Sequence, residues 1–278
     1  MGKWFARFLL NDGKEVVITG RNYGKLLKAK QELGVEIASN VEAVVNADVI
    51  LLSVPMDNFE EVVEQICHYT HPEQVIIDIT SLKVLPVEIM SKYIKTGLVL
   101  GAHPAFGPGA SGIANQNFIL TPTDEREENL AQKVREYLEA RGAKVTVMSP
   151  REHDEIMAII LGLSHFIAIV SADTLLNSDK SKQMLAIGGS TYKVLLTLAE
   201  SVISEDLEFY ASLQMNLPNM AETEKSFLRR GKAWADLVEN KEKQKFVRKL
   251  DALRSKLKES DPDFGKAYEK IYRIVEGS

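Results

Sequence analysis

The chain has 278 residues, of which 45% are apolar and 26% are charged, and its formal net charge is −5. These values are ordinary for a globular protein with room for two domains, and the negative charge argues against nucleic acid and anionic membranes as partners. The single cysteine, Cys67, excludes an internal disulfide and favours a reducing, cytoplasmic location. We expect neither a membrane-spanning segment nor a signal peptide.

The first 149 residues alternate between amphipathic helical stretches and short apolar runs. Helices are predicted at 2–10, 23–33, 40–46, 59–69, 86–94 and 127–141. Strands are predicted at 15–19, 35–38, 48–55, 75–77, 98–100, 117–122 and 144–148. Alternation at this spacing is typical of βαβ units. Residues 1–149 therefore predict a Rossmann-like, mostly parallel sheet, which is an α/β fold that binds dinucleotides.

Ser149-Pro150 ends this alternation, and residues 150–278 show only helical periodicity. Helices are predicted at 151–177, 190–204 and 205–215, and charged helices follow Leu217-Pro218. The stretch 156–176 is so apolar that it must be buried on most sides. We expect a small helical domain for substrate and dimerisation, completed by a second subunit.

Polar side chains follow two neighbouring strands of the predicted sheet. Thr80, Ser81 and Lys83 come after the strand at 75–77, and His103 comes after the strand at 98–100. Ligands of doubly wound sheets bind beyond the carboxyl ends of the strands, so these side chains should share one crevice. A solitary histidine is more often structural, but this position suits a base that accepts a hydroxyl proton.

The other residues of this crevice each have a second interpretation. Lys83 is either a clamp for an anion or an ordinary surface lysine. Ser81 binds the substrate or, as is more common, caps the next helix. His153-Asp154 falls in the first turn of a long helix, where a carboxylate suits the helix dipole, so the pair by itself predicts a structural role.

Two further features concern the remaining histidines. His165 lies in the middle of an apolar helix, where it is either bonded within the core or a contact of the substrate. The histidines lack the spacing of metal ligands and Cys67 has no partner, so no metal site is predicted.

A dinucleotide-binding fold normally opens with a strand and a glycine-rich turn ahead of the first helix. That strand is absent here, and Gly2 stands where the last glycine of the turn would be. The position of the ribose-binding acid holds Gly20, and Arg21 and Asn22 follow it. A guanidinium suits a 2′-phosphate, which favours NADP over NAD, unless Arg21 is simply a solvated loop cation.

Ser53, Val54 and Pro55 complete the predicted cofactor contacts, because they end a strand where backbone can approach a nicotinamide. Two explanations of the missing strand stay open. Either the start codon lies further upstream, or the chain is truncated and binds its cofactor poorly.

Taken together, these segments resemble the prephenate dehydrogenase family, especially its archaeal branch. The matching segments are 2–7, 19–21, 53–55, 78–83, 103–108, 153–154 and 162–166. The most specific of them is the H-P-x-F-G-P loop at 103–108 after D-x-x-S-x-K at 78–83. The resemblance implies NAD(P)-dependent oxidative decarboxylation of prephenate to 4-hydroxyphenylpyruvate in tyrosine biosynthesis. It also implies a homodimer joined through the helical domain.

The resemblance also implies roles for individual residues. His103 would be the base on the ring hydroxyl, Ser81 and Lys83 would line the site with Thr80, and His165 would face the substrate. The chain departs from the family where an arginine usually grips the side-chain carboxylate of the substrate. Lys193 keeps a charge nearby, but Glu200-Ser201 replaces the Gly-Arg pair. Losing such a clamp costs about 2–5 kcal/mol of binding.

This departure and the missing strand leave two alternatives open. One is a non-catalytic relative that acts by interaction and binds no cofactor. The other is a related dehydrogenase for arogenate or another cyclic or 2-keto acid.

Overall fold

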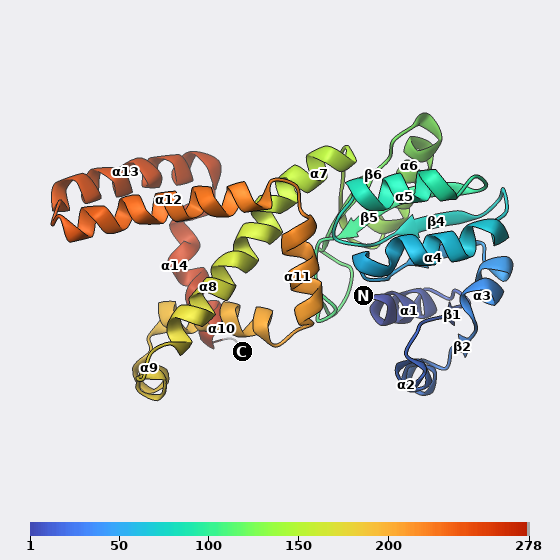
Figure 1. The fold of residues 1–278 in the computed structure, drawn as a ribbon, viewed down its shortest axis with the longest axis horizontal. Helices are drawn as coiled ribbons and strands as arrows, with labels where there is room; N and C mark the ends of the chain where they lie inside the picture. Colours follow the sequence, from blue (N-terminus) through green and yellow to red (C-terminus); the bar gives the residue numbers. More distant parts are fainter. Residues whose placement is uncertain (277–278) are drawn as a thin grey trace. The chain divides into compact units, whose positions relative to one another are not determined.

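The computed structural model describes residues 1–276, which fold into two compact units, residues 1–157 and residues 158–276 (Figure 1). We call them unit 1 and unit 2 and describe each by itself. Unit 1 therefore includes the first turns of the helix that the sequence assigns to the second domain, because residues 150–157 pack onto the sheet. The expected α/β half followed by an all-helical half is confirmed.

Unit 1 contains a five-stranded sheet with the strand order β3-β4-β5-β6-β7. Its strands are β3 (Val49–Leu52), β4 (Val75–Asp78), β5 (Leu98–Pro104), β6 (Asn117–Thr121) and β7 (Lys144–Val147). β3, β4 and β5 are parallel, β6 runs antiparallel to β5, and β7 is parallel to β6. Two short parallel strands, β1 (Val17–Ile18) and β2 (Glu36–Ile37), form a separate sheet.

The helices of unit 1 begin and end close to where the sequence predicts them. They are α1 (Gly2–Asn11), α2 (Tyr23–Leu33), α3 (Asn40–Asn46), α4 (Phe59–Ile66), α5 (Val84–Tyr93), α6 (Glu125–Glu139) and α7 (Pro150–Met157). α2 shows why its limits are readable. The Asn22 side chain accepts the first hydrogen bond from the Lys25 amide, and Gly34 ends the helix in the left-handed conformation, which favours glycine.

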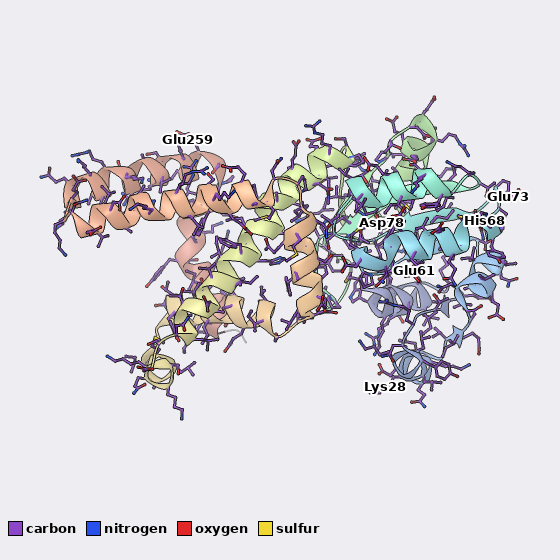
Figure 2. The ribbon with its side chains drawn as sticks, in the orientation of Figure 1. Lys28, Glu61, His68, Glu73, Asp78 and Glu259 are labelled. Carbon is purple, nitrogen blue, oxygen red and sulfur yellow. The ribbon has the colours of Figure 1, made fainter. Side chains whose placement is uncertain are left out.

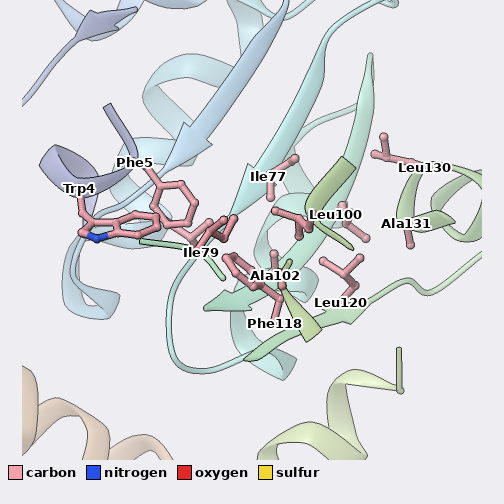
Figure 3. Close-up of a cluster of buried hydrophobic side chains, with 13 residues drawn as sticks. Trp4, Phe5, Ile77, Ile79, Leu100, Ala102, Phe118, Leu120, Leu130 and Ala131 are labelled. Atoms are coloured by element: carbon pink, nitrogen blue, oxygen red, sulfur yellow. The ribbon is translucent and has the colours of Figure 1, made fainter. Parts of the chain in front are cut away.

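Two apolar clusters cover the two faces of the five-stranded sheet, because successive strand residues point to opposite sides. One cluster contains Ile77 and Leu100 with Trp4 and Phe5 of α1, and it extends to Leu130 of α6 (Figure 3). The other contains Ile76 and side chains of α4 and α5. α1 is thus anchored on one sheet face by its buried Trp4, Phe5 and Ala6.

One strand is longer than the sequence predicts. The prediction ended the apolar run at Leu100 and placed His103 beyond it at a strand end with extended backbone, and β5 continues to Pro104. In the extended part, Gly101, Ala102, His103 and Pro104 pair antiparallel with β6. This pairing gives the backbone ladder partners that a loop would lack, and His103 is consequently held rigidly within the sheet.

Unit 2 is helical throughout its described part. Its elements are a π-helical segment (Ala158–Leu163), α8 (Ser164–Leu176), α9 (Ser181–Ile187), α10 (Ser190–Ile203), α11 (Leu207–Asn216), α12 (Met220–Glu239), α13 (Lys243–Ser260) and α14 (Ala267–Glu276). The predicted long helix at 151–177 is therefore one helical run with a π-helical interruption, a feature that often marks functional sites. The short helix α9 was not predicted.

The same helical run corrects one expectation from composition. Residues 150–176 are long and apolar enough to cross a membrane by length and hydropathy, although the sequence predicted no such run. Only part of this stretch is buried in the structure, and a core or interface helix has the same composition. The run carries the buried polar residues His153 and Asp154 near its start, which suits a protein interior.

Candidate active site

A buried ion pair lies at the carboxyl end of β4. Lys83 has no exposed side-chain surface, and its ammonium donates to the Asp78 carboxylate and to the carbonyl of Ala102 at 2.6 Å. Figure 2 shows Asp78 inside unit 1, whereas Glu61 and Glu73 lie at its surface. The interpretation of Lys83 as a clamp for a substrate anion is therefore not supported, since its hydrogen bonds are directed to groups of the protein.

Burial acts on both partners of this pair. Removal from water raises the pKa of Asp78 and lowers the pKa of Lys83, while their mutual attraction opposes both shifts. Asp78 also accepts the Thr80 amide at 2.7 Å, and the Thr80 hydroxyl donates to the Leu82 carbonyl at 2.9 Å. Thr80, predicted to bind substrate, thus has its hydroxyl engaged in shaping the turn after β4.

Glycine at position 101 lets Thr121 of β6 and Val87 of α5 lie close to β5. A Cβ at Gly101 would lie 2.4 Å from the Thr121 hydroxyl, 2.8 Å from a Val87 methyl and 3.4 Å from Cδ of Lys83. The Thr121 hydroxyl donates to the Gly101 carbonyl at 3.2 Å, which closes β6 onto β5 at this point. The close contacts with Thr121 and Val87 therefore require glycine here, whereas the Lys83 stem lies at ordinary van der Waals distance.

His103 belongs to a chain of hydrogen bonds that the sequence does not reveal. Its Nδ1 lies 2.8 Å from Nε2 of His153, and Nδ1 of His153 lies 2.7 Å from Oδ1 of Asp154. All three residues are buried, at 3%, 0% and 3% exposure respectively. The chain therefore joins β5 to α7 across fifty positions of sequence.

The chain of bonds fixes where the protons sit. Asp154 also accepts the backbone amides of Lys83 at 2.8 Å and Val84 at 3.0 Å, so it acts as an acceptor throughout. His153 must then donate from Nδ1, which leaves its Nε2 as an acceptor. His103 accordingly donates from Nδ1 and keeps the lone pair on Nε2. The imidazole of His103 is thus held in the tautomer that a base requires.

The second ring nitrogen of His103 is the free one. Nε2 has no hydrogen-bond partner among the described residues 1–276. In that same range, the fully buried side-chain nitrogen and oxygen atoms without a partner are His165 Nδ1 and Gln214 Oε1. His103 Nε2 also has no partner but is not among these fully buried atoms, so it keeps some exposed surface. Burial, followed by the nearby His153 and Lys83, lowers the pKa of His103 well below 6.5. The imidazole is therefore neutral at neutral pH.

Asp154, and not Ser81, caps the start of α5. The expected cap for α5 was Ser81, but the first amides of α5 donate to Asp154 from a segment seventy residues away. The Ser81 hydroxyl is half-buried and has no partner within residues 1–276. It therefore remains available to a ligand, next to the buried groups of the turn after β4.

The predicted cofactor residues gather at the carboxyl ends of β1 and β3. A Cβ on Gly2 would lie 3.3 Å from the Ser53 hydroxyl, so glycine keeps open the space between α1 and the end of β3. Ser53 and Pro55 are exposed and Val54 is half-buried. Arg21 is exposed and forms no ion pair within the described chain, whereas the Asn22 side chain is engaged in capping α2. These residues fit a dinucleotide, with amides at a helix start for phosphate.

The remaining predicted residues lie in unit 2. His165 is half-buried, its ring packs edge-on against Tyr210 at 4.8 Å, and burial lowers its pKa. Gln214, one turn beyond Tyr210, donates to the carbonyl of Gly162 in the π-helical segment at 2.8 Å. Sequence reasoning missed Gln214. The signal in the sequence was the spacing of four residues between the Tyr210 ring and the Gln214 amide, which places them on one helix face.

Lys193 is exposed on α10, in the same unit. Ser201, at the position of the family's arginine, donates to the carbonyl of Leu198 at 2.8 Å, and Glu200 is exposed. Neither residue can replace a guanidinium as a carboxylate ligand, so Lys193 is the cation that this helix offers.

Comparison with known sequences identifies the lineage of the chain. Residues 5–147 match the model of the prephenate dehydrogenase nucleotide-binding domain, and residues 149–252 match the model of the prephenate dehydrogenase dimerization domain. The chain belongs to the prephenate dehydrogenase family. The two matches meet at 147–149, close to the predicted boundary and eight residues before the division between the units.

Individual relatives agree with this assignment. A probable arogenate/prephenate dehydrogenase of Methanocaldococcus jannaschii is 34% identical over 253 residues, which are 89% of this chain and 56% of that protein. The T-protein of Enterobacter agglomerans is 31% identical over 208 residues, which are 73% of this chain and 53% of that protein. The chain thus spans little more than half the length of these relatives.

Solved structures show the same fold. The prephenate dehydrogenase of A. aeolicus, in complex with hydroxyphenyl propionate and NAD+, matches with a TM-score of 0.77 and 22% identity over 94% of this chain and 95% of that chain. Synechocystis arogenate dehydrogenase matches with a TM-score of 0.71 and 18% identity, over 94% and 96% of the two chains. At these identities the likeness establishes the architecture.

Proposed function

We propose that this member of the prephenate dehydrogenase family oxidises prephenate, or its aminated analogue arogenate, with a nicotinamide dinucleotide and releases carbon dioxide. The observation that carries the proposal is the chain Asp154–His153–His103, which ends in an unprotonated Nε2 with some exposed surface. A neutral imidazole held in one tautomer suits general base catalysis on a hydroxyl group.

In this proposal His103 accepts a hydrogen bond from the ring hydroxyl of the substrate. When bound, the nicotinamide supplies the acceptor for the hydride that leaves the hydroxyl-bearing carbon. Positive charge then builds on the hydroxyl, and its proton shifts towards Nε2 of His103. The ring charge that develops is shared through His153 with the carboxylate of Asp154, in a site removed from water. Loss of carbon dioxide makes the product ring aromatic.

Ser81 and Lys83 support this chemistry in different ways. The half-buried Ser81 hydroxyl, free within the described chain, can bond the substrate hydroxyl or the cofactor. Lys83 is a positioning residue, because its backbone amide binds Asp154 and its ammonium holds the Ala102 carbonyl next to His103. Asp154 and Lys83 thus orient both ends of the histidine chain.

The cofactor would bind across the ends of β1 and β3. The amides at the start of α1 would face the pyrophosphate, with Gly2 leaving space for it, and Ser53, Val54 and Pro55 would border the nicotinamide. NADP is favoured over NAD, because Arg21 is exposed, forms no ion pair within residues 1–276 and can bind a 2′-phosphate.

Within unit 2, His165 and Lys193 are proposed to contact an anionic ligand. Within unit 1, Thr80 would contribute backbone to a ligand rather than its engaged hydroxyl. Because Ser201 replaces the family's arginine, we expect weak binding of the substrate side-chain carboxylate. An amino acid side chain as in arogenate would suit the exposed Glu200 better than a keto acid, since Glu200 can pair with the ammonium.

A homodimer formed through unit 2 is part of the proposal. Unit 2 leaves many large apolar side chains exposed, among them Ile159, Ile160, Ile187 and Met215, and exposed apolar surface of this extent favours association. The matching family model describes a dimerization domain.

The decisive test replaces the base. His103→Gln should lower kcat by roughly 10²–10⁴-fold with little change in cofactor affinity, because a general base contributes about that much. Formation of reduced cofactor with prephenate and with arogenate is measured, and His71→Gln, at an exposed histidine, is the control. A His103→Gln enzyme with unchanged kcat would refute the role of His103. Absence of turnover in the unaltered chain with cofactor bound would refute the reaction.

The cofactor preference has a separate test. Arg21→Ala should weaken NADP binding, measured by titration calorimetry, and leave NAD binding nearly unchanged, while Lys25→Ala on the same loop–helix junction should change neither. Equal effects on both cofactors would contradict the role of Arg21.

A further inference from the structure

Trp4, in the first turn of α1, has a buried ring whose polar atom binds outside its own helix. The side chain is 9% exposed, and its Nε1 donates to the carbonyl of Ala110 at 2.8 Å, 106 positions further along the chain. Ala110 lies in the loop 105–116, which connects β5 to β6 and therefore follows His103 closely. A buried indole N–H normally has a partner, and here that partner belongs to the loop next to the proposed base.

The ring of Trp4 contacts the same loop a second time. Phe106 lies edge-on to it, with ring centroids 4.9 Å apart, and Phe106 in turn lies edge-on to Phe118 of β6 at 5.3 Å. Phe118 pairs with Pro104, the residue after His103. Figure 3 shows Trp4 and Phe118 in the same apolar cluster. A row of aromatic contacts therefore leads from α1 to the strand end that carries His103.

The middle of this loop is weakly constrained by its own packing. The exposed residues of the segment 107–112 are Gly107, Pro108, Gly109, Ser111 and Gly112. A Cβ on any of these three glycines would meet nothing within 4 Å, and none of the three has a positive φ. Neither space nor a left-handed conformation requires glycine here, so the glycines mainly add backbone freedom. The bond from Trp4 to the Ala110 carbonyl therefore ties a mobile type of backbone to α1.

The backbone of Trp4 belongs to the start of α1. The first amides of an α-helix have no carbonyl partner within the helix, and α1 begins at Gly2, so the Trp4 amide is one of them. The amide of Phe5 is bonded, because it donates to the Met1 carbonyl at 3.0 Å. In the proposed cofactor site the first amides of α1 face the pyrophosphate. One residue thus connects this end of the helix, through its backbone, with the loop after His103, through its side chain.

We propose that Trp4 is a positioning residue that couples the bound dinucleotide to the loop after His103. The indole holds the segment 107–112, and Phe106 and Phe118 hold the end of β5, in a fixed relation to the first amides of α1. A dinucleotide on these amides then stabilises the ordered loop, and the ordered loop keeps His103 at one distance from the nicotinamide. The kinetic part of this inference rests on the proposed function, whereas the structural part rests on cofactor binding alone.

Hydrogen exchange on the full chain without substrate tests the structural part. The reporter is the amide of Ala110, which donates to the Gly107 carbonyl at 3.1 Å. Trp4→Phe removes the indole N–H and keeps a ring, so exchange at Ala110 should become about tenfold faster, the factor that one hydrogen bond contributes. Saturating NADP should slow this exchange in the unaltered chain and not in Trp4→Phe. The control Trp234→Phe, at the other tryptophan, should behave as the unaltered chain.

Enzyme kinetics provide a readout that a purely structural role would not change. Trp4→Phe should lower kcat for formation of reduced cofactor about tenfold, whereas KM for NADP should change less than about twofold. Phe106→Leu changes the same connection from the loop side and keeps an apolar contact, so kcat should fall by about threefold. This second variant leaves α1 intact and decides the question if Trp4→Phe folds poorly.

Several results would overturn the proposal. Unchanged exchange at Ala110 in Trp4→Phe would exclude the tie, and faster exchange spread evenly over unit 1 would mean a purely structural role. Faster exchange with unchanged kcat would exclude positioning. Exchange at Ala110 that ignores NADP in the unaltered chain would exclude the coupling. If the unaltered chain binds NADP without turnover, the proposed reaction fails, and the response of Ala110 to NADP alone decides whether Trp4 couples the two.

Discussion

The two units of this protein differ in which apolar and polar side chains are buried and which are exposed. Unit 1 contains most of the buried apolar residues and all of the buried polar ones in the described chain, including Asp78, Lys83, His103, His153 and Asp154. Unit 2 contains most of the exposed large apolar side chains. Unit 1 therefore buries its polar network, whereas unit 2 leaves most of the large apolar side chains exposed.

This difference separates two kinds of function. A buried, fully bonded network can hold an imidazole in one tautomer, because every donor and acceptor constrains its neighbour. An exposed apolar helical surface instead favours association with another protein surface. Variants within the buried network of unit 1 should therefore change stability and kcat, whereas variants at the apolar surface of unit 2 should change self-association.

The largest expected effect comes from breaking the buried ion pair. Lys83→Met should lower the free energy of unfolding by about 3–5 kcal/mol, because it leaves the Asp78 carboxylate buried and unpaired. The double variant Asp78→Leu/Lys83→Met should recover much of that loss. Urea denaturation measures both, and Lys92→Met at an exposed ion pair is the control. A single variant as stable as the unaltered protein would show that unit 1 does not depend on the pair.

The second prediction concerns the far end of the histidine chain. Asp154→Asn should lower kcat by roughly 10²-fold, because loss of the carboxylate releases the tautomer and the orientation of His153 and His103. It should leave KM nearly unchanged, and Glu155→Gln next to it should change neither constant. A proportional loss of folded protein, seen by circular dichroism, in place of a lower kcat would contradict the orienting role.

The third prediction tests the surface of unit 2. Ile160→Asp should weaken self-association by at least about tenfold, since a charge would be buried in the contact. Ile160→Leu, which keeps the surface apolar, should not. Analytical ultracentrifugation over a dilution series measures the dissociation constant. A monomer at every concentration in the unaltered protein would remove the contrast between the units.

The smallest expected effect is a shift in pH dependence. The base works when neutral, and burial, His153 and Lys83 keep the pKa of His103 well below 6.5, so kcat/KM should hold as the pH falls below 6.5. Activity is lost only as pH falls through that lowered pKa. His153→Gln removes the neighbouring imidazole, whose electrostatic effect lowers this pKa, so the acidic limb should move to higher pH. A limb that moves down would contradict the coupling.

Local signals explain how much of this fold was readable from sequence. α2 was predicted with correct limits, because Asn22 and Gly34 are chemical signals at its two ends. β5 was predicted too short, since Gly101 and Pro104 are typical of loops and the pairing that extends the strand comes from β6. Its antiparallel partner is separated by a loop that no local pattern specifies.

The candidate site was readable only in part, for a similar reason. His103 and Ser81 were predicted as site residues from their place after apolar runs, and these roles stay predictions. His153-Asp154 was interpreted as a helix start, because its contacts lie fifty and seventy residues away in sequence. Lys83 was interpreted as a clamp, because sequence does not show that Asp78 and the Ala102 carbonyl surround its ammonium. Nonlocal hydrogen bonds, rather than residue types, decide these roles.

The glycine in the middle of β5 has an evolutionary consequence. Only a hydrogen atom at position 101 leaves space for the Thr121 hydroxyl and the Val87 methyl that lie against it. A larger residue at 101 would displace these two side chains, and a smaller residue at 121 would relax the requirement for glycine. In an alignment of homologous sequences, positions 101 and 121 should therefore change together or not at all.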